Sequence, residues 1–277
     1  RQCARVGAHG SAPKETPLDP RNRVVIITGA SSGIGAATAR CFAAAGARLV
    51  LAARSADTLA QVAAALPQAI AVPTDVSDPT ACHQLVERAV AAYGQVDILI
   101  NNAGIGLTGP VSSLARADLE RVLAVDLLGP VWLTQAVVPL MRAAGRGQII
   151  NVSSVLAVQP LPYLGGYAAA KAALEQISNA LRIELRGSGI AVTVVRPGTT
   201  RTGFNQRRLG RGRERRRIAP PGVPPEAVAR AILRAARTEP RLAYVSWTDR
   251  LALWVGRLAP GLVEAVLARA FAWEEQR

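Results

Sequence analysis

The chain has 277 residues, of which 50% are hydrophobic, enough for the packed core of one large α/β domain or two small ones. This composition excludes disorder of the whole chain. The formal net charge of +14 is compatible with a nucleic acid or an anionic membrane as partner. All basic residues except Lys14 and Lys171 are arginine, which favours a coding bias acting on ordinary surface charge.

Three cysteines, Cys3, Cys41 and Cys82, are widely spaced and odd in number. We expect no metal site and no disulfide framework, but small buried thiols in a reducing, cytoplasmic location. Residues 1–22 contain proline, glycine and charge without an apolar segment, so they predict a flexible tail and not a signal peptide. Because no stretch of about 18 uncharged apolar residues occurs, no helix is expected to span a membrane.

From residue 23 onward, short runs rich in Val and Ile alternate with alanine-rich stretches of helical periodicity. Apolar runs without polar alternation are typical of parallel strands buried on both faces. The alternation predicts right-handed crossovers and an α/β fold, a Rossmann-type, doubly wound parallel sheet of about seven strands. The expected strands are residues 23–28, 47–53, 69–74, 97–101, 147–154, 190–195 and 242–246, and the expected helices are 33–45, 55–65, 78–93, 113–144, 165–187, 225–237, 248–258 and 262–273.

We expect one catalytic domain over residues 23–245 and an amphipathic helical extension over 246–277. Residues 199–222 are rich in arginine, end in proline and lack helical or strand periodicity, so they predict a mobile loop. No aromatic platform accompanies the arginines, so no nucleic acid is expected as partner. The extension places Trp247, Leu251 and Trp254 at helical intervals, which is more typical of core or subunit packing than of a lipid-facing surface.

The first strand runs into the segment TGASSGIG, residues 28–35, and then into an alanine-rich helix. This turn needs Gly29 for unusual backbone angles, Gly33 for close approach of a phosphate, and Gly35 for packing of the helix on the strand. Free amides at the helix N-terminus would bind a pyrophosphate. We expect Ser31, Ser32 and Ile34, which lie between or beside these glycines, to contact the same bound molecule. A plain tight turn between a strand and a helix is the alternative.

The spacing Gly-x3-Gly-x-Gly, taken with three further motifs, resembles the short-chain dehydrogenase/reductase family in its NADP-preferring type. NNAG at 101–104 is similar to the family's sheet-stabilising motif, YAAAK at 167–171 to its active-site helix, and RPG at 196–198 with Thr202 to its nicotinamide-side turn. The resemblance covers residues 23–245. It implies an oxidoreductase that interconverts a carbonyl and an alcohol, assembled as a homodimer or homotetramer.

The end of the second expected strand indicates which dinucleotide binds. An NAD enzyme places a carboxylate there, which binds the ribose 2′-hydroxyl. This chain has Ala53 followed by Arg54, and a guanidinium can bind a 2′-phosphate through charge-assisted hydrogen bonds. We therefore expect NADP(H), with Ser31 as a second contact. The alternative is that Arg54 is a solvated residue at a helix start.

The resemblance implies further cofactor contacts in three places. Asp75 and Val76 would lie at the adenine, and Asn101, Ala103 and Gly104 would follow the fourth strand. The turn beside the nicotinamide would comprise Pro197, Gly198 and Thr202. Asp78 is expected only to cap the helix that follows it.

Tyr167 and Lys171 are four residues apart and therefore share one helix face. A nearby cation stabilises a phenolate, so Lys171 is expected to lower the pKa of Tyr167 from its ordinary value of about 10. Tyr167 would protonate the oxygen of a carbonyl that receives hydride, while a serine hydroxyl holds that oxygen. The family's serine lies 13 residues before its tyrosine, which selects Ser154 over Ser153. By resemblance, Lys171 also binds the nicotinamide ribose.

Two residues near this site leave questions open. Tyr163 is expected in the loop entering the helix, where its phenol could line the substrate pocket. Asp126, in VDLLG, stands where the family has a catalytic asparagine, and its negative charge would stabilise the lysine cation.

We weigh three functions. The first is an NADPH-dependent carbonyl reductase or alcohol dehydrogenase, whose substrate is apolar if the C-terminal stripe lines the pocket. The second is a low-turnover NADP(H)-binding regulatory or scaffold protein. The third, a peripheral membrane enzyme, follows from the C-terminal stripe and the positive charge.

Overall fold

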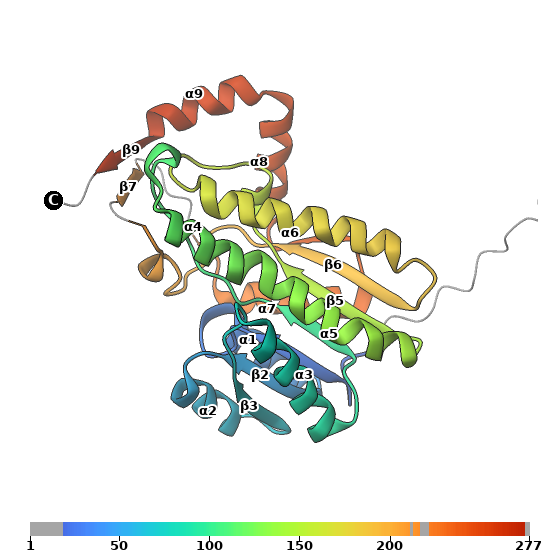
Figure 1. Ribbon diagram of the computed structural model, residues 1–277. Coiled ribbons are helices and arrows are strands. Elements are labelled where there is room, and N and C mark those ends of the chain that lie inside the picture. Colours follow the sequence, from blue (N-terminus) through green and yellow to red (C-terminus); the bar gives the residue numbers. More distant parts are fainter. Residues whose placement is uncertain (1–18, 211–212, 217–221, 275–277) are drawn as a thin grey trace, which may run out of the picture.

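A computed structural model describes residues 19–210, 213–216 and 222–274. Seven parallel strands form one sheet in the order β3-β2-β1-β4-β5-β6-β8 (Figure 1). This sheet confirms the predicted Rossmann-type fold. Its order reverses between β1 and β4, where ligands bind in such sheets. The strands are β1 Val24–Thr28, β2 Arg48–Ala53, β3 Ala69–Pro73, β4 Ile98–Asn101, β5 Gly147–Val152, β6 Ile190–Arg196 and β8 Leu242–Tyr244.

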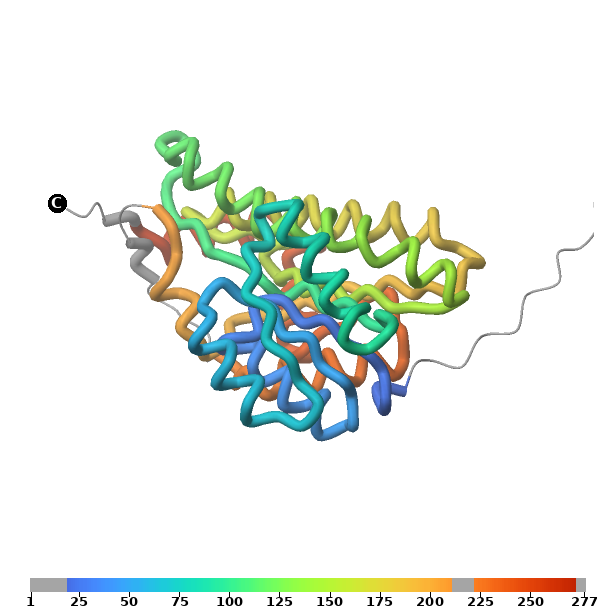
Figure 2. The backbone as a smooth tube through the Cα atoms, turned by 60° about the horizontal axis from the view of Figure 1, so that its bottom comes forward, coloured from blue at the N-terminus to red at the C-terminus, as the bar shows by residue number. Residues whose placement is uncertain are grey.

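Helices cover both faces of the sheet, because each central strand has apolar side chains on both of its faces. Val25 and Ile27 of β1 pack into one core with Phe42 and Ile232. Their neighbours in the chain pack into a second core with Leu133. The helices on the first face are α1 Gly33–Ala44, α2 Ala56–Ala64 and α7 Pro225–Thr238. Those on the second face are α3 Pro79–Tyr93, α5 Gly129–Ala143 and α6 Gly165–Glu184. Helices α5 and α6 lie side by side (Figure 2).

A local sequence signal sets the start of helix α3. The Asp78 carboxylate accepts a hydrogen bond of 2.8 Å from Thr80 N, so the predicted cap of α3 is confirmed. Cys82, on the same helix, is buried as expected, and burial raises the pKa of its thiol to about 12. Cys41 is only partly buried, and Cys3 lies outside the described residues.

One long helix predicted over residues 113–144 is interrupted in the structure. It comprises α4 Arg116–Leu123, a π-helical turn η2 Ala124–Leu128, and α5. A π turn inside a helix often marks a functional site, and this one contains Asp126. The stretch Arg116–Ala143 is long and apolar enough to span a membrane by composition, but Val137 and Met141 are fully buried in the core beside the sheet.

The C-terminal region differs most from the expectation. Helices α8 Trp247–Leu258 and α9 Pro260–Ala270 are followed by β9 Phe271–Glu274, which pairs antiparallel with β7 Arg213–Arg216. The prediction of an irregular loop over 199–222 is therefore wrong at β7, and the last helix ends three residues earlier than expected. The reason is a long-range pairing between two segments, one of which reads RERR and carries no apolar alternation.

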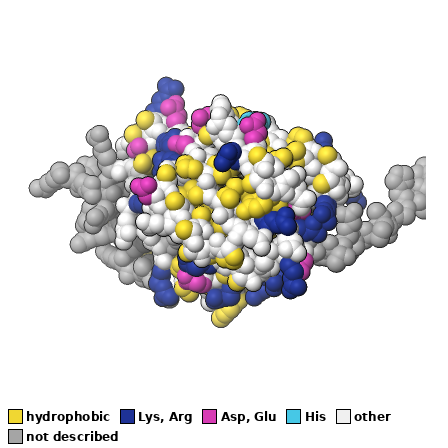
Figure 3. Space-filling model, turned by 90° about the horizontal axis from the view of Figure 1, so that it is seen from below, with side chains coloured by type: hydrophobic (Ala, Val, Ile, Leu, Met, Phe, Trp, Pro, Cys, Tyr) yellow, Lys and Arg dark blue, Asp and Glu magenta, His cyan; other side chains and the backbone are white. Residues whose placement is uncertain are grey.

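Basic and acidic side chains share one face of the molecule. On the face seen from below in Figure 1, dark blue basic side chains lie in several separate groups with acidic side chains among them (Figure 3). This distribution is typical of ordinary surface charge.

Candidate active site

A cavity of about 940 Å³ lies at the carboxyl ends of the parallel strands. Its lining comes from the loops after β1 to β6, together with α6, α8 and α9. This volume suits a cofactor together with a substrate. Every residue predicted at the site lines the cavity except Asn101, Asp126 and Tyr163.

The glycine-rich turn forms one end of the cavity. Gly29 has φ of 66° and Gly33 has φ of 54°, the left-handed region that favours glycine. A Cβ on Gly35 would collide with the Gly29 carbonyl oxygen, so α1 can approach β1 this closely only with glycine there. Gly29 and Gly35 therefore have the backbone roles expected from the sequence, and the approach of a phosphate to Gly33 stays a prediction.

The N-terminus of α1 suits an anionic group. Ser32, the N-cap, makes no capping hydrogen bond through its side chain, and the first turn contains no acidic residue. Ser31, Ser32 and Ile34 line the cavity at this point. The pyrophosphate of a dinucleotide fits such a turn, because it can accept hydrogen bonds from these free amides.

The loops after β2 and β3 carry the groups expected near the adenosine. Arg54 is exposed and lines the cavity beside Ala53, without a carboxylate at that position. Asp75 and Val76 follow β3 and line the cavity too. Burial acts to raise the pKa of Asp75, but hydrogen bonds from Arg121, at 2.6 Å, and Ser77 lower it to about 2. Asp75 is therefore already paired as a carboxylate.

Asn101 does not lie where a cofactor contact was expected. Its side chain is buried and donates a hydrogen bond of 2.8 Å to Asn151 Oδ1 on the neighbouring strand. A residue inside a strand points to one face of the sheet, and this one points into the core. Asn102 lines the cavity in its place, with Ala103 and Gly104.

Tyr167, Lys171 and Ser154 come together at the centre of the cavity. Tyr167 and Lys171 lie on α6, with the lysine Nζ 5.8 Å from the centroid of the tyrosine ring. The buried ammonium donates a hydrogen bond of 3.1 Å to Val152 O. Ser154 follows β5, and its hydroxyl accepts a hydrogen bond from Leu156 N at 3.1 Å. One helix and one strand end thus present these three side chains to the same space.

The two tyrosines near this helix have different positions. Tyr167 lines the cavity, and its ring meets Phe204 edge-on at 5.7 Å between centroids. Tyr163 lies in the turn before α6, as expected, with φ of 67°. Tyr163 is not among the described residues that line the cavity, so the expectation that its phenol lines the pocket is not met.

Asp126 lies behind Lys171, outside the cavity. Its Oδ2 is 3.2 Å from Lys171 Nζ, and its Oδ1 accepts a hydrogen bond of 2.8 Å from Ile105 N. Both side chains of this ion pair are almost fully buried. Gly104 lies directly above them, and a Cβ there would be 2.9 Å from Asp126 Oδ2. Asp126 therefore acts on the site through the lysine.

The pKa shift of Tyr167 has the opposite direction to the one expected from the sequence. Burial raises the pKa of Tyr167; Lys171 lowers it, Asp126 raises it further, and a hydrogen bond with Ser154 lowers it, so that the net direction is upward. Burial lowers the pKa of Lys171, but Asp126 and Tyr167 raise it, and the net direction is again upward. The lysine remains a cation, while the buried carboxylate beside it offsets its effect on the phenol.

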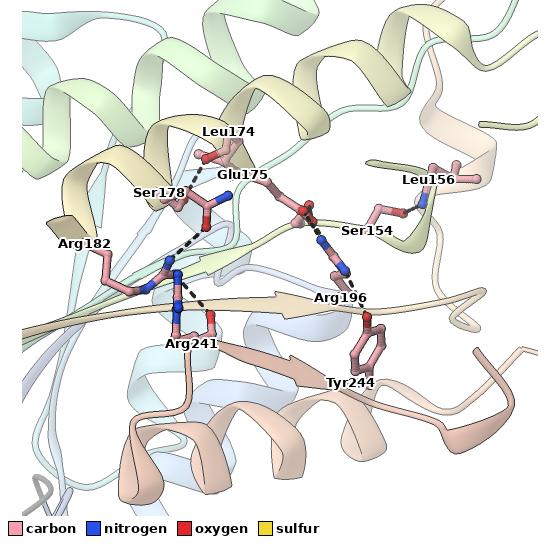
Figure 4. A network of polar contacts seen from close by, with 11 residues as sticks. Ser154, Leu156, Leu174, Glu175, Ser178, Arg182, Arg196, Arg241 and Tyr244 are labelled. Carbon is pink, nitrogen blue, oxygen red and sulfur yellow. Dashed lines mark hydrogen bonds and ion pairs between the residues drawn. The ribbon is translucent and has the colours of Figure 1, made fainter. Parts of the chain in front are cut away.

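A buried polar network supports the site from behind (Figure 4). Arg196 donates from Nε to Glu175 Oε1 at 2.8 Å, forms an ion pair with the same carboxylate through Nη2, and donates from Nη1 to Tyr244 Oη at 2.9 Å. Ser153 Oγ donates to Glu175 Oε1 at 2.7 Å, so Ser153 is occupied there. The network links α6, β5, β6 and β8. Sequence reasoning missed it, although Glu175 lies one turn beyond Lys171.

Other residues missed from the sequence come from the C-terminal part. Arg207 Nη2 donates a hydrogen bond of 3.1 Å to Ser32 Oγ across the cavity. Asp249 of α8 lies against Gly198, where a Cβ would be 2.5 Å from either carboxylate oxygen. Long-range contacts of this kind carry no local sequence signal.

Comparisons with known proteins agree with this geometry. The sequence profile of the family described as short chain dehydrogenase matches residues 23–211. A dehydrogenase/reductase SDR family protein 7-like of Anopheles gambiae is 35% identical over 87% of this chain and 80% of its own. A 3-ketodihydrosphingosine reductase of Bacteroides thetaiotaomicron is 35% identical over 67% of both chains.

Solved structures are similar as well. A 3-ketoacyl-(acyl-carrier-protein) reductase from Brucella melitensis, complexed with NADH, matches with a TM-score of 0.73 and 28% identity over 80% of this chain and 96% of its own. A metagenomic short-chain oxidoreductase in complex with NADP matches with a TM-score of 0.67 and 33% identity over 79% and 92%. The fold, the motifs and these matches together show that the chain belongs to the short-chain dehydrogenase/reductase family of oxidoreductases.

Proposed function

We propose that this protein is an NADPH-dependent oxidoreductase that reduces an apolar ketone or aldehyde, or oxidises the corresponding alcohol. The observation that carries this proposal is that one cavity is lined by the glycine-rich turn, Arg54, Ser154, Tyr167 and Lys171. A nucleotide held at one end and a carbonyl held at the other would meet at the tyrosine.

The preference for NADPH rests on the end of β2. Arg54 is exposed on the cavity wall and can form charge-assisted hydrogen bonds with a 2′-phosphate. A carboxylate that would repel this phosphate is missing, because residue 53 is alanine. Similar structures contain NADH or NADP, so the preference is argued from these residues of the chain itself.

The residues divide the work of the reaction between them. A bound nicotinamide dinucleotide supplies hydride for reduction and accepts it for oxidation. The Tyr167 phenol donates its proton to the carbonyl oxygen of the substrate during reduction and takes the alcohol proton in the reverse direction. The Ser154 hydroxyl donates a hydrogen bond to the same oxygen as negative charge develops on it. Lys171 stabilises the phenolate left on Tyr167 and is the candidate to bind the nicotinamide ribose.

An apolar substrate is supported by the far wall of the cavity. Its lining there includes Leu161, Leu164, Leu251, Val263 and Leu267. Side chains of this type bind hydrocarbon by removing it from water, at about 25 cal/mol per Å². Two relatives are named as reductases of carbonyl compounds, a ketoacyl reductase from Nostoc and the 3-ketodihydrosphingosine reductase.

A panel of carbonyl compounds tests the proposal. The wild-type protein is incubated with NADPH, and nucleotide oxidation is followed spectrophotometrically for ketones of increasing apolar chain length. We expect turnover that rises with chain length. Absence of turnover with every compound, together with saturable NADPH binding, would favour the second candidate function.

That second candidate is a low-turnover NADP(H)-binding regulatory or scaffold protein. The observation that favours it is the buried ion pair between Asp126 and Lys171, because a carboxylate here works against ionisation of Tyr167. If it is correct, Asp126→Asn should raise a slow turnover. Robust wild-type turnover that Asp126→Asn does not raise would contradict it.

We also propose a homodimer or homotetramer. Ile177 and Ile183 on α6 and Leu140 on α5 are large apolar side chains exposed on neighbouring helices. An interface between copies would bury them. Sedimentation of the purified chain tests this assembly, and a monomer at micromolar concentration would contradict it.

A further inference from the structure

The outward face of α8 is apolar, the reverse of an ordinary surface helix. Trp247, Leu251, Trp254 and Leu258 recur at intervals of three and four residues and so share one face. Their exposed fractions are 76%, 49%, 60% and 63%. Leu253 and Gly256 are buried on the opposite side. A helix in water normally turns such a stripe toward the core, so this face lacks a partner within the described chain.

Helix α9 extends the same surface. Leu262 and Val266 are 65% and 50% exposed. The two helices bend by 113° at the break between them, so the pair forms a corner and not a straight span. We call the apolar side chains of this corner the α8–α9 surface: Trp247, Leu251, Trp254, Val255, Leu258, Leu262 and Val266.

Positive charge flanks this surface. Arg250 and Arg257 lie on α8 and Arg269 lies on α9, all three exposed. The acidic residues of the same helices are fewer, since Glu264 is exposed but Asp249 is partly buried against Gly198. Tryptophan and leucine with arginine at the edge are typical of a helix that lies in the interface of a membrane.

The α8–α9 surface is continuous with the cavity. Trp247, Leu251 and Val255 are exposed and also line the cavity, while Val263 and Leu267 line it from α9. A hydrocarbon chain in a membrane could therefore pass into the cavity along apolar side chains alone.

We propose that the α8–α9 surface binds an anionic phospholipid bilayer and that the cavity opens toward it. Apolar side chains enter the boundary between headgroups and acyl chains, and the flanking arginines contact the phosphates. A second copy of the chain would also bury the apolar side chains, but it would add a second set of these arginines to the same region. The charge therefore favours lipid. Binding to the bilayer does not depend on the proposed reaction.

Vesicle flotation with the full chain tests this inference. The vesicles are phosphatidylcholine with phosphatidylserine, or phosphatidylcholine alone, at low salt. We expect binding to the anionic vesicles and at least about tenfold weaker binding for the double variant Trp254→Ser, Leu258→Ser. Val111→Ser is the matched control, because Val111 is 72% exposed and lies in the 3₁₀ turn Val111–Ser113, outside α8 and α9. Circular dichroism verifies that each variant folds.

A charge variant gives a second, smaller readout. Arg257→Gln should weaken binding to anionic vesicles about fivefold, whereas Arg142→Gln, exposed on α5, should not. Lack of wild-type binding at low salt would overturn the inference, as would equal losses in Val111→Ser. Dissociation of an oligomer by the double variant, without vesicle binding by the wild type, would assign the surface to a second copy. Carbonyl turnover is measured separately, so loss of either activity is distinguishable from loss of the other.

Discussion

The glycine-rich turn after β1 and the first turn of α9 differ in how tightly their backbones are constrained. In the glycine-rich turn, a Cβ on Gly29 would lie 2.9 Å from Ala103 Cα, and a Cβ on Gly35 would lie 2.1 Å from the Gly29 carbonyl oxygen. In the first turn of α9, Gly261 has nothing within 4 Å of the position where its Cβ would lie. The glycine-rich turn, the strand ends and α6 form a frame around the cavity, and the C-terminal part with α8 and α9 adds apolar side chains to its lining. On the proposed function, the frame carries the chemistry and the C-terminal part selects the substrate.

The largest effect should come from removing the proton donor held by the frame. Tyr167→Phe should lower kcat for carbonyl reduction by about 100- to 10,000-fold, because general acid catalysis contributes on this scale. Tyr163→Phe, in the turn before the same helix, should leave kcat nearly unchanged. Steady-state kinetics with NADPH measures both. Equal rates in the wild type and Tyr167→Phe would remove Tyr167 from the reaction.

A pair of glycine substitutions compares the two parts directly. Gly35→Ala forces α1 away from β1 and should lower the free energy of unfolding by about 1–3 kcal/mol. Gly261→Ala in α9 should raise it by up to about 1 kcal/mol, because alanine favours helix. Denaturant titration measures both changes. Similar effects of the two substitutions would contradict the contrast in constraint.

The choice of cofactor should depend on one side chain in the frame. Arg54→Asp should shift the ratio of Kd values for NADPH and NADH by roughly 10- to 100-fold toward NADH, because hydrogen bonds to charged groups contribute about 1.5–3 kcal/mol. Arg88→Asp, an equal charge change on the exposed side of α3, should leave the ratio unchanged. A shift of equal size in both variants would point to overall charge and not to a 2′-phosphate contact.

The smallest effect concerns pH. Asp126 raises the pKa values of both Tyr167 and Lys171, so Asp126→Asn should lower the pKa of Tyr167. Alcohol oxidation requires the phenolate, so the rise of its rate with pH should move to lower pH in Asp126→Asn. Reduction requires the phenol, so the fall of its rate at high pH should also move to lower pH.

The pH profiles of Glu184→Gln, exposed at the end of α6, provide the matched control. We expect this profile to coincide with that of the wild type. An unshifted Asp126→Asn profile would mean that the buried carboxylate does not act on the tyrosine.

The difference between the two parts also explains what the sequence could predict. The frame was predictable, because glycines at a strand end and a tyrosine one helical turn before a lysine have few physical interpretations. Asn101 was misplaced, since its motif does not reveal which face of the strand each asparagine uses. The upward pKa direction of Tyr167 was missed because it depends on burial, which spacing does not encode.

The C-terminal part could not be predicted in the same way. The pairing of β7 with β9 and the contact of Arg207 with Ser32 join residues far apart in sequence. The spacing of the tryptophans in α8 predicted an apolar stripe, but core packing and outward exposure give the same periodicity. Only the structure shows that Trp247 and Trp254 face outward.

Titration of the unmodified protein with NADPH and with NADH tests the central claim most directly. The claim is that the frame binds a dinucleotide phosphate through Arg54 and the glycine-rich turn. We predict saturable binding of both nucleotides, with NADPH bound at least about tenfold more tightly. Absence of saturable binding, or equal or tighter binding of NADH, would contradict it.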